Sequence, residues 1–156
     1  MRQRGFTLIE MVVTAAVVAM LAAIAVPVVQ LSLQRARESE LRLALRQIRE
    51  GLDAYKRQVD EGRIARPADG SGYPPSLEAL VRGVADQRSP GGARIYILRR
   101  IPRDPFERDP TLDAAATWGL RSHASPPDEP AEGADVYDVY SLAPGAGLNG
   151  IPYREW

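Results

Sequence analysis

The first thirty residues, MRQRGFTLIEMVVTAAVVAMLAAIAVPVVQ (residues 1–30), decide how the rest of the chain is arranged. Two arginines precede Gly5, and an apolar run follows and continues to about Val29. The run contains one carboxylate, Glu10, and one proline, Pro27. It is long enough to cross a bilayer, because a spanning helix needs about 20 mostly apolar residues. Since flanking basic residues stay in the cytoplasm, the sequence predicts a single span with the following part facing outward.

Glu10 is the anomaly in this span. An ionised carboxylate in the hydrocarbon of a bilayer costs about 2.5 kcal/mol or more on insertion scales, unless it is paired. A plain hydrophobic anchor has no use for such a residue. Glu10 is therefore a candidate functional residue.

The string GFTLIE, from Gly5 to Glu10, resembles the processing motif of type IV pilins and of type II secretion pseudopilins. The resemblance implies cleavage between Gly5 and Phe6 by a prepilin peptidase, and N-methylation of Phe6. It also implies that Glu10 meets the freed amino terminus of a neighbouring subunit during assembly. Pro27 corresponds to the helix-breaking proline of the family, which removes a backbone donor and kinks or locally melts the helix.

Two other interpretations of the same stretch stay open. An ordinary secretory signal also has arginines before an apolar core, and Ala23–Ala25 (AIA) offers a cleavage site for a signal peptidase. Alternatively, the run is an uncleaved anchor in which Glu10 has no role.

Composition restricts the classes of function. The 156 residues suffice for the anchor and one small domain. With 20 basic and 20 acidic side chains, the balance of charge gives no indication of nucleic-acid binding. The chain has no cysteine, so no disulfide cross-links the outward-facing part.

After Pro27 the pattern becomes amphipathic. Apolar residues recur at intervals of four and three, which predicts one buried stripe on a helix that runs from near Phe6 to near Asp60. Gly51 lies within this pattern and is interpreted as a point of close approach by a sheet. The stripe consists of Leu41, Leu45, Ile48, Leu52, Tyr55 and Val59.

The remainder of the chain predicts an α+β domain. Pro74–Gly83 is expected to form a short helix that Ser76 caps and Gly83 ends. In the last of the expected strands, Tyr137 and Val139 are predicted to face the core, and the preceding segment 123–134 is predicted to be an exposed loop. The expected strands or extended segments are Ile95–Leu98, Thr117–Ser122 and Val136–Ser141.

Two further segments resemble the major pseudopilin of type II secretion systems. They are Tyr73–Leu80 (YPPSLEAL) and Ile101–Phe106 (IPRDPF), although Phe106 stands where the family usually has tryptophan. Asp104 in the second segment is expected to accept hydrogen bonds from backbone amides of a turn. The resemblance implies a pilin-like fold: a long N-terminal helix with a hydrophobic first half, packed on a small antiparallel sheet.

The resemblance makes calcium the cofactor to consider, because major pseudopilins commonly bind it in the loop after the last strand. Calcium takes six to eight oxygen ligands, often from several carboxylates. Here the loop reads LAPGAGLNGIPYREW (residues 142–156), and its only carboxylate is Glu155. Asp135 and Asp138 are interpreted as solvated. The sequence therefore predicts no family-type calcium site. Apolar contacts are expected to hold the segment instead, through Leu148, Ile151, Tyr153 and Trp156.

No catalytic constellation is visible. His123 is the only histidine, no nucleophile motif accompanies it, and it is interpreted as a lone surface residue. Without cysteine there is no soft metal-ligand cluster, and Gly91-Gly92 lacks the spacing and lysine of a phosphate-binding loop. An enzyme is not expected.

The resulting hypothesis is a non-enzymatic structural subunit, a pseudopilin of a periplasmic filament, with a type IV pilin or minor pilin-like subunit as the alternative. A membrane-anchored periplasmic binding domain that never polymerises is the alternative of another class. The expected partners are copies of the chain, minor pseudopilins, prepilin peptidase, an inner-membrane assembly platform and the membrane. The expected division is a leader at 1–5, an assembly half-helix at 6–30, an amphipathic half-helix at 31–60 and a periplasmic domain at 61–156.

Overall fold

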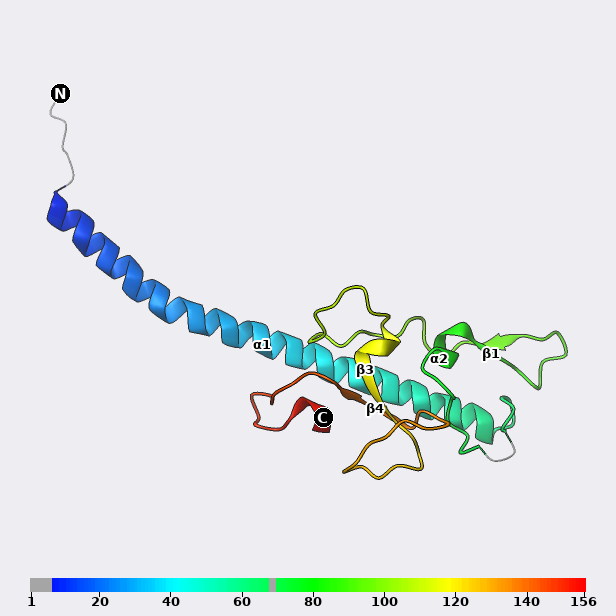
Figure 1. Ribbon diagram of the computed structural model, residues 1–156. Coiled ribbons are helices and arrows are strands. Elements are labelled where there is room, and N and C mark those ends of the chain that lie inside the picture. The colour runs from blue at the N-terminus through cyan, green and yellow to red at the C-terminus, as the bar shows by residue number, and fades with distance from the viewer. Residues whose placement is uncertain (1–6, 68–69) are drawn as a thin grey trace. The chain divides into compact units, whose positions relative to one another are not determined.

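The computed structural model describes residues 7–67 and 70–156. It contains a long helix followed by short strands, a short helix and two 3₁₀ turns (Figure 1). Two compact units are distinguished by their internal contacts: one ends at Arg37, and the other extends from Glu38 to Trp156. The helix contributes to both units.

Helix α1 comprises Leu8–Asp60, 53 residues in all. At 1.5 Å per residue it is about 80 Å long. The expected helix is thus confirmed from Leu8 onward, whereas Phe6 lies outside the described residues. Pro27 lies inside α1, which is helical on both sides of it, so the locally melted alternative is not the form seen here.

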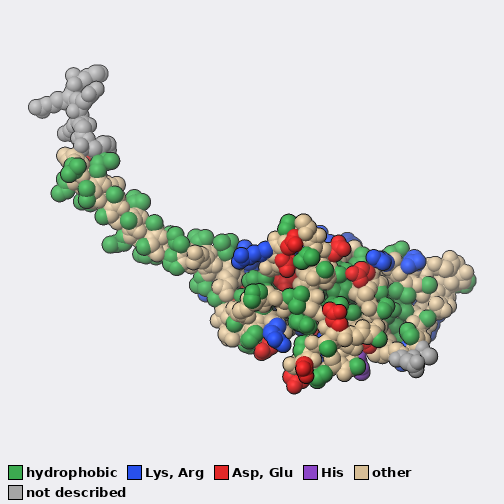
Figure 2. Space-filling model, in the orientation of Figure 1, with side chains coloured by type: hydrophobic (Ala, Val, Ile, Leu, Met, Phe, Trp, Pro, Cys, Tyr) green, Lys and Arg blue, Asp and Glu red, His purple; other side chains and the backbone are tan. Residues whose placement is uncertain are grey.

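The first half of α1 is apolar and exposed. Figure 2 shows hydrophobic side chains along its visible face, whereas charged side chains gather over the second unit. The largest of these exposed side chains are Leu8, Ile9, Met11, Val12, Val13, Val17, Val18, Met20, Leu21, Ile24, Val26, Val28 and Val29. This half is long and apolar enough to cross a membrane.

The second half of α1 buries one face, as its periodicity predicts. All six residues of the apolar stripe are buried, and Leu43, which departs from the stripe, is exposed. Gly51 is buried on the same face, and a Cβ built there would lie 3.2 Å from the side chain of Leu98. The close approach is therefore made by Leu98, which lies outside the strands.

The strands form two separate antiparallel pairs. Strand β1 (Val84–Ala85) pairs with β2 (Arg94–Ile95), so β2 covers only the first residue of the expected Ile95–Leu98 strand. The amides of Ile97 and Leu98 instead donate to the carbonyl of Leu80. Strand β3 (Trp118–Arg121) pairs with β4 (Asp138–Ser141).

The predicted core side of the last strand is partly wrong. Val139 is fully buried, as expected, but Tyr137 is only half-buried and Val136 is buried instead. The reason is that β4 begins at Asp138. Before that residue the amide of Val136 donates to the carbonyl of Pro74. The alternation of a regular strand therefore does not extend back to Val136.

The short helix α2 comprises only Ala79–Arg82, and its first cap position is Glu78. The expected cap at Ser76 is therefore wrong, and the preceding residues form turns. Gly83 ends the helix, as predicted, with a φ of 76° that favours glycine.

The segment before β3 is tied to the β3–β4 pair. Asp104 is buried and accepts a hydrogen bond from the amide of Phe106 at 2.8 Å, which confirms the expected turn. Its carboxylate also accepts the hydroxyl of Ser141. The indole of Trp118 donates to the carbonyl of Pro102 at 2.9 Å. The remaining elements are the 3₁₀ turns η1 (Ala115–Thr117) and η2 (Tyr153–Glu155).

Gly119 provides a test of the β3–β4 packing. It pairs with Tyr140, and a Cβ at Gly119 would lie 2.3 Å from the tyrosine ring. We expect Gly119→Ala to lower the free energy of unfolding by about 1–3 kcal/mol through overpacking. Chemical denaturation in detergent would measure the change. Gly91→Ala is the matched control, because nothing lies within 4 Å of a Cβ there. Equal stability of the two variants would contradict the packing described.

Candidate functional site

The candidate processing site, Gly5 and Phe6, lies outside the described residues. The structure therefore places only Glu10 and Pro27 of the four predicted site residues. Both belong to the first half of α1, and they lie 17 positions apart in one continuous helix.

Glu10 takes part in a capping box at the start of α1. The amide of Glu10 donates to Thr7 Oγ1 at 3.3 Å, and Glu10 Oε2 accepts from the amide of Thr7 at 3.5 Å. These reciprocal contacts satisfy donors that a helix start leaves without an intrahelical partner. The sequence reasoning missed this role, although the T-x-x-E spacing of residues 7–10 was its signal.

The carboxylate of Glu10 has an apolar neighbourhood. Leu8, Ile9, Met11 and Val12 beside it are all exposed, as is Glu10 itself. In a membrane or in a bundle of such helices, a carboxylate so placed is stabilised by an opposite charge from another chain. The carboxylate of Glu10 is thus exposed among apolar side chains.

Pro27 lacks the amide that would bond within the helix. Its ring occupies the place of the hydrogen, so the carbonyl four residues earlier loses its usual donor. The helix nevertheless continues through this position. Pro27 is therefore a weak point of α1 at the end of the apolar half.

A second candidate site lies in the globular unit, where α1 holds the segment after β4. We call residues 142–156 the tail. Glu38 is a buried carboxylate, only 4% exposed, and its Oε1 accepts from the amide of Leu148 at 2.9 Å and from the hydroxyl of Tyr153 at 3.1 Å. The sequence reasoning missed this residue, because a single glutamate among the many charges of α1 gives no signal of its partner.

Arg49 contacts the same region from the same helix. Its Nε donates to Asp138 Oδ1 at 2.7 Å, and its Nη2 donates to the main-chain oxygens of Val139 at 3.1 Å and Trp156 at 2.7 Å. A single guanidinium thus joins β4 to the end of the tail. Arg42 adds a cation–π contact, with its Cζ 4.4 Å from the centroid of the Trp156 ring.

The expected apolar hold on the tail is only half right. Tyr153 is buried and Trp156 is half-buried, and the two rings make an edge contact with centroids 5.2 Å apart. Leu148 and Ile151 are each 45% exposed, so that part of the expectation is wrong. Polar groups of α1 contribute to holding the tail, through the hydrogen bonds of Glu38 and Arg49.

The carboxylates near the tail are engaged with other side chains. Within the described part of the chain, no group of three or more acidic, histidine or cysteine side chains lies close enough to hold a metal. Asp138 is not simply solvated, as was expected, because it accepts from Arg49 and, at 3.4 Å, from Arg121. Calcium needs six to eight oxygens, and the tail itself carries one carboxylate, Glu155.

Asp135 is not simply solvated either, because it organises the start of the 123–134 loop. Its carboxylate accepts from Ser71 Oγ, from Ser122 Oγ at 2.9 Å and from the amide of His123 at 2.8 Å. Burial opposes ionisation, but the hydrogen bonds from Ser71, His123 and Ser122 outweigh it and lower the pKa of Asp135.

His123 is exposed, as predicted, and lies in an aromatic cluster. Its ring is stacked with Tyr73 at a centroid distance of 6.1 Å and meets the edge of Tyr137 at 5.3 Å. Its backbone amide donates to Asp135 at 2.8 Å. These contacts are structural, and they do not form a nucleophile–base pair.

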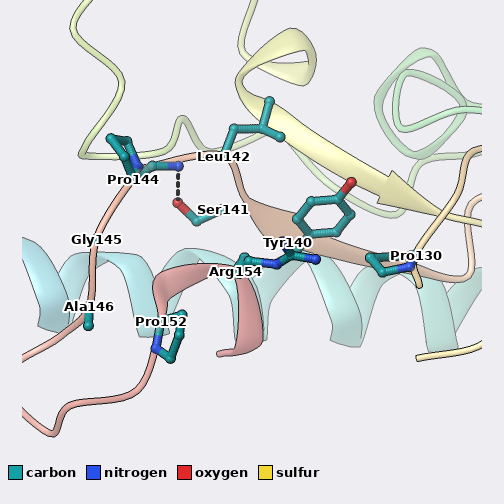
Figure 3. A pocket seen from close by; sticks show the side chains of 10 residues that line it. Pro130, Tyr140, Ser141, Leu142, Pro144, Gly145, Ala146, Pro152 and Arg154 are labelled. Carbon is teal, nitrogen blue, oxygen red and sulfur yellow. Dashed lines mark hydrogen bonds between the residues drawn. The ribbon is translucent and has the colours of Figure 1, made fainter. Parts of the chain in front are cut away.

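An open pocket of about 610 Å³ lies between the end of β4 and the tail (Figure 3). Tyr140, Leu142 and Pro152 are among the side chains around it, and Arg154 is its one charged lining residue. The hydroxyl of Ser141 is committed to Asp104 and is not a free nucleophile. The lining gives no indication of acid–base chemistry.

Comparison with known proteins finds one family model that matches the start of the chain and relatives that match most of its length. Residues 1–26 match the family model described as the prokaryotic N-terminal methylation motif. The chain is 27% identical to the type II secretion system core protein G of Klebsiella pneumoniae, over 97% of this chain and 89% of that protein. It is 28% identical to the core protein G of Klebsiella michiganensis, over 75% and 78% of the two chains. No solved structure matches the chain.

The lowered pKa of Asp135 predicts a specific loss of stability in acid. A carboxyl with a folded pKa below its unfolded value stabilises the fold above the unfolded pKa, and this contribution disappears as the pH falls through the folded pKa. We expect Asp135→Asn to lower the free energy of unfolding at neutral pH by about 1–3 kcal/mol, because hydrogen bonds to a charged acceptor are lost. The difference from the wild type should shrink in acid.

Chemical denaturation in detergent from neutral pH to about pH 3 would measure this. Asp128→Asn, at an exposed aspartate of the same loop, is the control and should leave the profile unchanged. A constant difference between Asp135→Asn and the wild type at every pH would contradict the assignment.

Proposed function

We infer that the chain belongs to the superfamily of type IV pilins and type II secretion pseudopilins. On this premise, we propose that it is a structural subunit of the pseudopilin class. The observation that carries the proposal is the N-terminal methylation motif at residues 1–26, with Glu10 at the start of an exposed apolar helix. The likeness to core protein G over 97% of the chain supports the type II secretion class.

In the proposed mechanism, prepilin peptidase cleaves between Gly5 and Phe6 and Phe6 is methylated at its new amino group. The cleavage creates a positive charge at the start of the apolar half-helix. Glu10 of a neighbouring subunit then meets this charge. Each charge reduces the burial penalty of the other in a medium of low dielectric constant, so assembly favours the paired register.

The apolar half-helices (residues 6–30) form the core of the filament, and the globular domains (residues 61–156) form its outside. The amphipathic half-helix (residues 31–60) connects them, and Met1 to Gly5 is the removed leader. Before assembly the chain is a single-pass protein of the bacterial inner membrane with its domain in the periplasm. The work is mechanical rather than enzymatic, and a cytoplasmic ATPase supplies the assembly energy.

The partners follow from this role. Copies of the chain and minor pseudopilins pack along the filament, and an inner-membrane platform passes subunits into it. A type IV pilin is the alternative. The chain lacks the C-terminal cysteine pair of typical type IV pilins, because it contains no cysteine.

Processing gives the first test. In a host with prepilin peptidase, we expect the purified protein to begin at N-methylated Phe6, as measured by intact mass and N-terminal sequencing. The same gene in a host without the peptidase is the control and should give the chain from Met1. A mature chain that begins near Val26 would identify an ordinary secretory signal and would exclude the proposal.

Glu10 gives the second test, which separates a filament subunit from an anchor. We expect Glu10→Ala to abolish filaments, because one carboxylate in the apolar core is needed to pair each amino terminus. Sheared filaments would be counted by electron microscopy, and membrane insertion would be checked by fractionation. Glu40→Ala, at an exposed glutamate of the same helix, should assemble normally. Normal filaments from Glu10→Ala would refute the assigned role.

A further inference from the structure

Few large apolar side chains of the tail are buried, for a segment of fifteen residues. It forms one isolated bridge, Ala146 to Pro152, and the turn η2. Of its larger side chains, Leu142, Leu148 and Ile151 are exposed, Trp156 is half-buried and Tyr153 is buried. Burial of one or two rings does not by itself fix the path of such a segment, because every ordered residue loses backbone entropy. Something else must hold the tail in place.

We propose that Glu38 and Arg49 form a clamp that fastens the tail to α1 and takes the place of a metal ion. The two residues are 11 positions apart on one helix. Eleven residues make about three helical turns, so both side chains project from the same face, about 17 Å apart along the axis. The clamp therefore binds the tail at two separated points.

Glu38 is the first arm of the clamp. Its Oε1 accepts hydrogen bonds from the amide of Leu148 in the middle of the tail and from the hydroxyl of Tyr153 in η2. Hydrogen bonds to a charged acceptor are about twice as strong as neutral ones. They are also protected from water here, because Glu38 is buried.

Arg49 is the second arm, and its surroundings resemble a cation site. The guanidinium contacts one carboxylate, that of Asp138, and two main-chain oxygens, those of Val139 and Trp156. Carboxylates and backbone carbonyls are the ligands that calcium takes from a protein. In this chain the positive charge is supplied by a covalently attached side chain, which needs only these three oxygens.

The carboxylates of the region are consequently occupied. Asp138 is paired with Arg49 and also contacts Arg121, and Glu38 is committed to the tail. Recruiting either for calcium would leave a donor of the fold without its partner, which is unfavourable. The clamp thus predicts that calcium removal leaves the tail in place.

Amide hydrogen exchange of the full chain in detergent tests the clamp directly and does not depend on filament formation. In the wild type, we expect peptides of residues 143–156 to exchange at the same rate in EDTA and in millimolar calcium. We expect Glu38→Met and Arg49→Met each to raise exchange in these peptides about tenfold or more, because a hydrogen bond to a charged group is lost. Peptides of β3 should remain protected.

The controls are Glu40→Met and Arg57→Met, which make the same chemical changes at exposed positions of α1 and should leave the tail unaffected. If Glu38→Met does not fold, Tyr153→Phe removes a single hydroxyl and should raise exchange of the tail about fivefold. Two results would overturn the proposal. One is faster exchange of the wild-type tail in EDTA that calcium reverses. The other is an unchanged exchange rate of the tail peptides both in Arg49→Met and in a variant of the first arm, Glu38→Met or Tyr153→Phe.

Discussion

The constraint on which the structure depends is that one helix must satisfy two different surroundings. The first half of α1 exposes apolar side chains on all sides, whereas the second half buries a single stripe and leaves its other faces charged. The hydrophobic effect rewards burial of the stripe in water, at about 25 cal/mol for each Å² of apolar surface. In the described part of the first half the large apolar side chains are exposed, and this half is long and apolar enough to cross a membrane.

The globular unit is built on the buried stripe. Leu80 of α2, Trp118 of β3 and Val139 of β4 all belong to the same core cluster as the stripe. The strands are only two to four residues long and form two separate pairs, so they have little stability of their own. They persist because residues of both pairs belong to the core cluster of the buried stripe or pack against it. The polar contacts of Glu38 and Arg49 then extend this attachment to the tail, where few of the large apolar side chains are buried.

The periodicity of the sequence predicted those features of the fold that depend on a single helix or turn. The stripe from Leu41 to Val59 needs only helical geometry and solvent, and it was predicted without error. The positions of Glu10 and Pro27 within a single long helix were predictable for the same reason. Gly83 was identified because few other residues adopt a positive φ at the end of a helix.

What escaped prediction depends on contacts between distant segments. The partners of Glu38 lie more than 100 positions away, and nothing in the local sequence identifies which glutamate of α1 is buried. Asp135 and Asp138 were judged solvated because their donors, Ser71 and Arg49, come from remote parts of the chain. Tyr137 was misplaced because alternation assumes a regular strand, and a backbone bond to Pro74 interrupts it.

In the proposed assembly, the carboxylate of Glu10 would have two successive donors: the Thr7 amide of its own chain and then the amino terminus of a neighbour. In the single chain its Oε2 contacts the amide of Thr7 at 3.5 Å, the outer limit of a hydrogen bond, so this contact is weak. A free amino group would offer a charged donor, and charge-assisted bonds are shorter and about twice as strong. Replacement of the Thr7 amide by a free amino group as the donor to Glu10 would therefore be favourable once the surroundings exclude water. Until then, the local contact keeps the carboxylate at the helix start, where the positive end of the helix dipole also stabilises its charge.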